Sequence, residues 1–169
     1  MKQPNKSGIK IIDYGSSCFA NQRIYTYIQS RFYRAPEIIL GIPYTSAIDI
    51  WSFGCILAEL YTGLPIFPGE NESEQLGLIM EVFGVPSKQV IQLSQRRDLF
   101  FNQDNSPIIA TSSKGVERLP ASKDLATELK CSDPNFLDFL KQCFKWHPYD
   151  RQTPLQALQH PWILEGLPE

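Results

Sequence analysis

Three features of the 169-residue sequence predict a mainly α-helical domain. An apolar run over about 46–63 places hydrophobic residues on nearly every face of a helix and ends at Gly63. Hydrophobic residues recur at helical spacing over 72–83. Two capping residues, Asp133 and Thr153, each precede a proline and begin further helices. The β-branched run at residues 9–12 predicts one short strand.

Composition excludes several classes of protein. A hydrophobic share of 43% with 12% aromatic residues argues against disorder, and a net charge of −2 gives no basic surface for nucleic acid. No apolar stretch reaches the roughly 18 residues of a membrane span. The four cysteines are too scattered for a metal pair and are interpreted as reduced thiols. We therefore expect a soluble protein, cytoplasmic by default with the nucleus left open.

The apolar run over about 46–63 opens with Ser-Ala-Ile-Asp, which has the form of a capping box. In such a box, the Ser46 hydroxyl and the Asp49 carboxylate would each accept a hydrogen bond from an unpaired backbone N–H. Because hydrophobic residues cover all faces, we expect this helix to be buried at the centre of the fold.

The remaining segments divide the chain into a long loop, an insertion and a helical end. Residues 14–45 show little periodicity but are rich in Tyr and Arg, which is typical of a functional loop. A polar, weakly patterned region over about 84–130 predicts an insertion with one or two short helices and a flexible stretch near 102–113. The final helices are expected over about 133–163.

Four short motifs occur in a characteristic order. Asp-Tyr-Gly at 13–15 would alone be an ordinary turn signal, but Ala-Pro-Glu follows at 35–37. Asp-Ile-Trp-Ser-Phe-Gly comes at 49–54, and Arg151 lies near the end. This order resembles that of protein kinases, in which the first two motifs bracket the activation segment.

The loop sequence narrows the resemblance. Gly-Ser-Ser-Cys at 15–18 and Tyr-Thr-Tyr-Ile-Gln-Ser-Arg-Phe-Tyr-Arg at 25–34 closely resemble the dual-specificity tyrosine-regulated kinases, the DYRK family. The resemblance implies a mainly α fragment, the large C-terminal lobe of a protein kinase domain, with the short strand preceding its activation segment. It assigns 13–37 to the activation segment, 46–63 to the central helix and 84–130 to the group-specific insertion.

The resemblance also implies the activity and the roles of several residues. Such kinases transfer the ATP γ-phosphate to protein Ser/Thr and autophosphorylate a loop tyrosine, here Tyr27. Asp13 would bind Mg²⁺ and, through it, ATP. Arg31 and Arg34 would receive the phosphotyrosine. Two alternatives stay open: Tyr25 as the target, or a Tyr/Arg cluster that only stabilises the loop through stacking and cation–π contacts.

Three further residues are expected to support the site without taking part in chemistry. Glu37 and Arg151 would form a buried ion pair that ties the end of the loop to the helical core. Asp49 would brace the backbone of a catalytic loop, with plain helix capping as the competing interpretation. His147 and His160 lie beside prolines near predicted helix ends and favour capping or packing over metal binding.

The printed sequence contains no Gly-rich phosphate loop, no strand lysine with a helix glutamate and no His-Arg-Asp loop. We therefore assign no catalytic residue and expect the chain alone to be inactive, with apolar surface left uncovered. Two functions stay open. The chain is part of an active dual-specificity kinase acting on protein substrates, or it is a non-catalytic interaction module that binds substrates or regulators.

Overall fold

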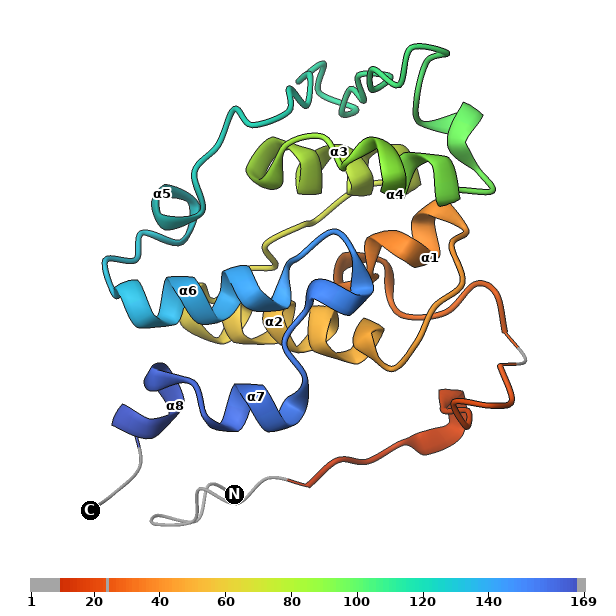
Figure 1. Ribbon diagram of the computed structural model, residues 1–169. Helices are drawn as coiled ribbons and strands as arrows, with labels where there is room; N and C mark the ends of the chain where they lie inside the picture. Colours follow the sequence, from red (N-terminus) through yellow and green to blue (C-terminus); the bar gives the residue numbers. More distant parts are fainter. Residues whose placement is uncertain (1–9, 24, 167–169) are drawn as a thin grey trace.

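Helices make up almost all of the regular structure in the computed structural model, which describes residues 10–23 and 25–166 (Figure 1). This confirms the predicted mainly α fold. The α-helices are α1 Pro36–Leu40, α2 Ala47–Thr62, α3 Glu72–Phe83, α4 Lys88–Leu93, α5 Leu125–Leu129, α6 Pro134–Cys143, α7 Pro154–Leu158 and α8 Pro161–Glu165. The 3₁₀ turns are η1 Tyr14–Ser16, η2 Arg31–Tyr33, η3 Arg97–Leu99 and η4 Pro148–Asp150.

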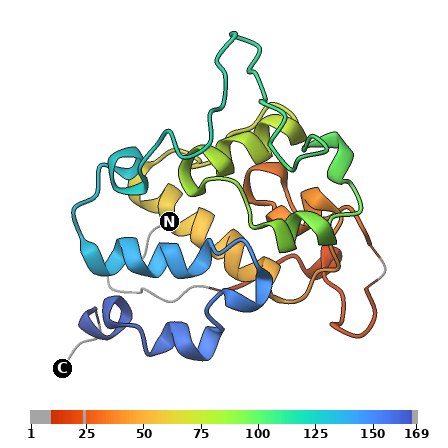
Figure 2. The same ribbon diagram turned by 45° about the horizontal axis from the view of Figure 1, so that its top comes forward.

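Helices α2 and α6 lie side by side at the centre in both views, with α3 and α4 on one side and α7 and α8 on the other (Figures 1 and 2). Trp51 of α2 is fully buried and meets the ring of Phe144 edge-on at 5.0 Å between centroids. A Cβ on Gly54 would come within 2.8 Å of the Cys143 Cβ. This glycine therefore permits the close approach of α2 to α6.

The predicted cap is present at two helix starts and absent at a third. The Asp133 carboxylate accepts hydrogen bonds from two N–H groups of α6, and Thr153 forms a full capping box with Gln156. Ser46, however, has αR backbone angles and makes no capping bond, so the predicted Ser46–Asp49 box is absent. Instead, the Thr45 hydroxyl accepts a hydrogen bond from the Ala47 N–H at 3.2 Å. The cap residue needs an extended backbone to aim its oxygen at the helix, and Ser46 lacks it.

The prediction that α2 is buried on all sides is also wrong. Its inner face is buried, but Leu60 is 77% exposed and three other large side chains on the same helix lie at the surface: Phe53, Ile56 and Tyr61. Phe53 and Tyr61 each meet one ring of α6, those of Phe139 and Phe136, but the described residues leave them 40% and 52% exposed. A hydrophobic pattern indicates which side chains avoid water but does not supply the partner that buries them.

The strand predicted before the Asp-Tyr-Gly motif is not formed over residues 10–12, and Ile9 lies outside the described residues. Ile11 and Ile12 are 77% and 80% exposed. A strand requires the backbone of a neighbour to pair with, and no described residue pairs with this segment. In the part of the chain that the structure describes, strand-like pairing is limited to two isolated bridges, Phe101–Pro107 and Thr111–Glu117.

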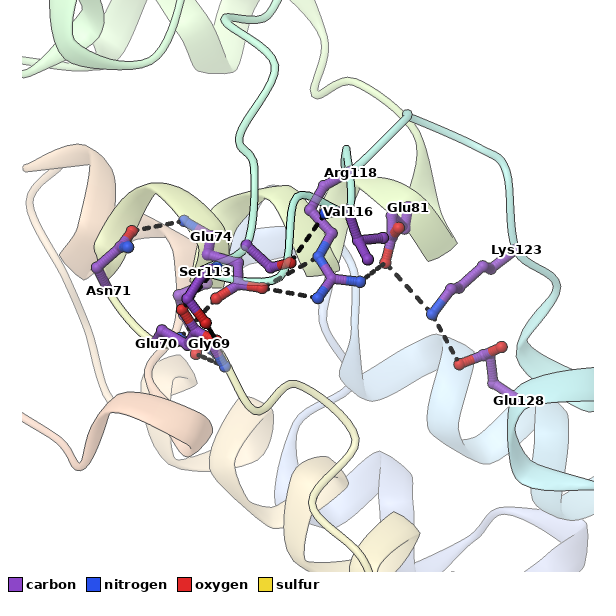
Figure 3. Close-up of polar contacts among 12 residues, drawn as sticks. Gly69, Glu70, Asn71, Glu74, Glu81, Ser113, Val116, Arg118, Lys123 and Glu128 are labelled. Atoms are coloured by element: carbon purple, nitrogen blue, oxygen red, sulfur yellow. Dashed lines mark hydrogen bonds and ion pairs between the residues drawn. The ribbon is translucent and has the colours of Figure 1, made fainter.

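Charged side chains fasten the insertion to α3 (Figure 3). Arg118 pairs with Glu74 at 2.7 Å and with Glu81 at 3.6 Å, and both carboxylates are almost fully buried. At the start of α3, the Glu70 carboxylate accepts hydrogen bonds from the Ser113 hydroxyl at 2.7 Å and backbone N–H at 3.0 Å. The stretch near 102–113, which we expected to be flexible, begins and ends in hydrogen-bonded turns. Of the described helices, none has the length and apolar character needed to cross a bilayer.

Candidate functional site: the loop between the Asp-Tyr-Gly and Ala-Pro-Glu motifs

The downstream end of the loop is anchored by the Glu37–Arg151 ion pair, which is present as expected. Two hydrogen bonds of 2.6 Å join the guanidinium to the carboxylate, and the exposed fractions of the side chains are 0% for Arg151 and 1% for Glu37. Arg151 also donates to the carbonyls of Ala47 and Lys145 and lies over the ring of Trp51. The charges of Glu37 and Arg151 thus compensate each other within the core. Their ion pair fixes α1 against α2.

Arg34 and Tyr27 are in direct contact upstream of this anchor. The Arg34 guanidinium lies 4.0 Å from the centroid of the Tyr27 ring and donates a 2.8 Å hydrogen bond to the Tyr27 hydroxyl. Its other donors bond the carbonyls of Ile28 and Gln29. Arg34 is 4% exposed, whereas Tyr27 is 58% exposed. A buried cation with three neutral acceptors therefore faces an accessible phenol.

Arg31 points elsewhere: within the described residues it forms no hydrogen bond or cation–π contact with Tyr27. Its guanidinium donates a 2.6 Å hydrogen bond to the backbone carbonyl of Glu70, just before α3. The Glu70 carboxylate binds Ser113 of the insertion, so one residue connects the loop to the inserted segment. Of the two predicted phosphate-binding arginines, the structure thus brings Arg34 to the tyrosine. It places Arg31 beside Glu70, just before the N-terminus of α3.

Gln29 is a residue of the site that sequence reasoning missed. Its backbone is left-handed, with φ +68°, and its side chain makes three hydrogen bonds, two to α2 and one to the residue before α1. The amide donates to the Ile48 carbonyl at 3.0 Å and the Ser52 hydroxyl at 2.7 Å, while its oxygen accepts from the Ala35 N–H at 2.9 Å. Gln29 therefore ties the loop to α2. A lone Gln in a loop gives no signal in sequence.

Two tyrosines that we did not single out are also held in place. The Tyr33 hydroxyl donates to the Glu59 carboxylate at 2.6 Å, and this hydrogen bond to an anion raises the pKa of Tyr33. The Tyr44 hydroxyl donates to the Tyr25 carbonyl at 2.8 Å, and burial, followed by its contact with Cys18, raises the Tyr44 pKa. Their partners lie at least 19 residues away, beyond the reach of a local motif.

Asp13, the predicted Mg²⁺ ligand, is exposed and has left-handed backbone angles, with φ 64°. The described residues contain no cluster of three or more His, Cys, Asp or Glu side chains that could hold a metal. Mg²⁺ takes one or two carboxylates together with phosphates that other groups must hold. Asp13 supplies one such oxygen ligand, so the residues present do not by themselves fit an Mg²⁺–ATP site. Tyr14, 65% exposed, does not act as a packed aromatic plug here.

Asp49 projects from the first turn of α2 and forms no capping bond there. It lines a cavity of about 340 Å³ together with residues 16–18 of the loop. Partial burial raises the pKa of its carboxyl. Asp49 thus lies beside the loop, and its bracing role stays a prediction.

The sequence matches the protein kinase domain family over residues 1–163. Because this match covers nearly the whole chain, the protein belongs to the protein kinase family. Among curated proteins it is 56% identical over 163 residues to "Dual specificity tyrosine-phosphorylation-regulated kinase 2" of Drosophila melanogaster. It is 56% identical over 161 residues to the human "Dual specificity tyrosine-phosphorylation-regulated kinase 4" and 54% identical over 160 to the "DYRK-family kinase pom1" of Schizosaccharomyces pombe.

Within the protein kinases, the chain belongs to the DYRK family, as its loop sequence indicated. The three alignments cover 96%, 95% and 95% of this chain but 23%, 31% and 15% of those relatives. The chain therefore spans less than a third of the length of these relatives. Members of this family are protein kinases that use ATP and Mg²⁺ and act on proteins.

Proposed function

We propose that this chain is the switch-bearing large lobe of a dual-specificity protein kinase, with 13–37 as its activation segment and 84–130 as its group-specific insertion. Tyr27 is the regulatory phosphorylation site, and Arg34 and Arg31 are the groups that receive its phosphate. The observation that carries this proposal is the contact of the buried Arg34 guanidinium with the exposed Tyr27 hydroxyl at 2.8 Å. The Tyr27 oxygen that would carry the phosphate therefore already contacts the Arg34 guanidinium.

Phosphorylation would strengthen this contact for an electrostatic reason. A phosphotyrosine carries about −1.5 to −2 charges and three acceptor oxygens, so a hydrogen bond to a neutral phenol becomes a charge-assisted one. Bonds of this kind contribute roughly 1.5–3 kcal/mol. Arg31 would exchange the neutral Glu70 carbonyl for the phosphate and thereby draw the start of α3 into the ordered loop.

In a complete kinase this lobe would serve transfer of the ATP γ-phosphate to Ser/Thr of protein substrates. Asp13 would hold Mg²⁺, Asp49 would brace the catalytic loop, and Glu37 with Arg151 would keep the segment in place. The printed sequence has no His-Arg-Asp loop, and Asp13 belongs to no cluster of three or more potential metal ligands among the described residues. We therefore expect the 169-residue chain to show no transfer to peptides when supplied with Mg²⁺ and ATP.

The switch is tested with two forms of the chain, one carrying phosphotyrosine at position 27 through genetic-code expansion. We expect chymotrypsin to cleave the 25–33 region of the phosphorylated form several-fold more slowly, since the phosphate fixes the loop. Arg34→Ala should remove this protection, and Arg97→Ala, an arginine that bonds only the insertion and Asp98, should keep it. Equal protection in Arg34→Ala would contradict the assignment of Arg34.

A non-catalytic interaction module is the second candidate, favoured by the exposed face of α2, where Leu60 is 77% exposed. In this case the lobe would bind substrates or regulators of kinases without transferring phosphate. Both candidates predict no transfer by the purified chain, so Mg²⁺–ATP calorimetry and a peptide phosphorylation assay check this shared expectation, and measurable turnover would contradict it. Sequencing the transcript upstream of Met1 separates the two: an in-frame His-Arg-Asp loop would favour the active kinase, and the lack of one would favour the interaction module.

A further inference from the structure

A cavity of about 490 Å³, lined in part by Tyr27, opens beside the proposed switch. Its walls come from loop residues 23 and 25–27, from the end of the loop and the α1–α2 connection at 37–38 and 41–44, and from residues 95–96 after α4. Pockets that bind ligands typically measure about 300–1,000 Å³ and are mostly apolar, with a few polar groups. This cavity has the size of such a pocket and combines elements from both the loop and the insertion.

The floor of the cavity is hydrophobic. Ile38 of α1 and Tyr44 are 3% and 9% exposed, and Ile42 and Pro43 continue the same surface. Glu37 is the carboxylate among the lining residues, but two hydrogen bonds to Arg151 neutralise it from the core side. The interior therefore suits an uncharged aliphatic or aromatic side chain, because a buried charge would find no partner there.

The rim of the cavity is cationic. Arg96 is neutralised by Glu72 through two hydrogen bonds of 2.9 and 2.8 Å. Arg23 has no carboxylate partner among the described residues: it donates to the Tyr44 carbonyl and lies over the Tyr44 ring. Arg31 and Arg34 lie outside the lining and, together with Arg96, help to lower the pKa of Glu72. Arg23 is therefore the cation of the lining that has no carboxylate partner among the described residues.

We propose that this cavity is a docking site for an extended, acidic segment of a partner protein. The segment places one aliphatic or aromatic side chain on the Ile38–Tyr44 floor and an adjacent aspartate or glutamate beside Arg23. Charge complementarity selects an acidic partner, and the apolar floor selects a hydrophobic anchor flanked by acids. The proposal goes beyond phosphoryl transfer, because binding requires neither ATP nor a phosphate on Tyr27.

Three fluorescent 12-residue peptides test this proposal by anisotropy against the full 169-residue chain without ATP. The first has a central leucine–phenylalanine pair flanked by aspartates. The second replaces the aspartates by lysines, and the third replaces the central pair by alanines. We expect the first to bind at least tenfold more tightly than either of the others, with the difference shrinking as salt rises.

Two variants locate the binding. Arg23→Glu reverses the rim charge, and Thr26→Trp fills the cavity from an exposed lining position whose side chain makes no hydrogen bond in the described structure. Each should weaken the acidic peptide at least tenfold. Lys141→Glu, an equal charge change on exposed α6 surface, should leave the affinity within twofold.

Thermal unfolding of each variant shows whether it keeps the native fold. Equal binding of the acidic and basic peptides would overturn the proposal. Unchanged affinity in a folded Thr26→Trp variant would overturn it too, because the peptide would then bind elsewhere. These results leave the switch proposal untouched, since protection of the loop by phosphotyrosine is measured separately.

Discussion

Two buried guanidinium groups in this molecule meet very different partners. Arg151 meets Glu37 where both side chains are almost fully buried, whereas Arg34 meets a tyrosine that is 58% exposed. Before Arg34 none of the described residues is buried, and from Arg34 through α1 every residue is. A buried guanidinium therefore holds a fixed anchor through Arg151 and an adjustable contact through Arg34.

The comparison is tested most severely by Arg151→Ala, which would leave the Glu37 carboxylate buried without a counterion. We expect the free energy of unfolding to fall by about 3–5 kcal/mol, measured by urea denaturation. Lys141→Ala, an exposed side chain on α6 with no hydrogen bond or ion pair in the described structure, serves as the control and should change stability by about 0.5 kcal/mol or less. A loss below about 1 kcal/mol in Arg151→Ala would show that the anchor is not structural.

Gly54→Ala tests the packing of the anchored part, because the added methyl group would come within 2.8 Å of Cys143 and 3.0 Å of Phe144. We expect a loss of about 1–3 kcal/mol from overpacking between α2 and α6. Gly166→Ala is the matched control, since a Cβ there would meet no atom closer than 3.6 Å. Equal effects at the two glycines would contradict the tight α2–α6 contact.

Arg34→Ala tests the adjustable contact. It removes three hydrogen bonds that join Arg34 to residues 27–29, so its effect should be confined to the loop. We expect chymotrypsin to cleave near Tyr25 and Tyr27 faster. The urea midpoint of the core should shift by less than half of the Arg151→Ala effect. Global unfolding of Arg34→Ala would erase the distinction between the two arginines.

Glu72→Gln should have the smallest effect and a definite pH dependence. The hydrogen bond from Arg96 lowers the pKa of Glu72 from its usual 4.5. This pair therefore stabilises the fold above about pH 4.5, and its contribution is lost as the pH falls through the lower, folded-state pKa. We expect Glu72→Gln to lose about 0.2–1 kcal/mol at pH 7.

The same variant should differ less from the wild type at pH 3, when both are followed by thermal melts. Glu117→Gln, which removes an exposed carboxylate with no ion pair among the described residues, should show no such convergence. A gap between Glu72→Gln and wild type that widened toward pH 3 would have the wrong sign for a lowered pKa.

Part of this structure could be predicted because the responsible interactions are local. Asp133 and Thr153 cap their helices through atoms two or three residues away, and periodicity alone located α3. The Glu37–Arg151 pair spans 114 residues and was reached only through family resemblance. Gln29 could not be found by either route, since two of its three hydrogen bonds depend on where α2 lies. The Ser46 cap was wrong because the pattern does not fix the backbone angles at that residue.

Taken alone, the amino-acid order determined the helical class, most helix ends and the kinase kinship, since these rest on short-range propensities and motifs. The tertiary structure decided which arginine meets Tyr27, which face of α2 is left exposed, and that an apolar cavity with a cationic rim lies beside the loop. Each of these depends on the packing of distant segments, and such packing is set by the sum of many weak contacts that no short stretch of sequence contains.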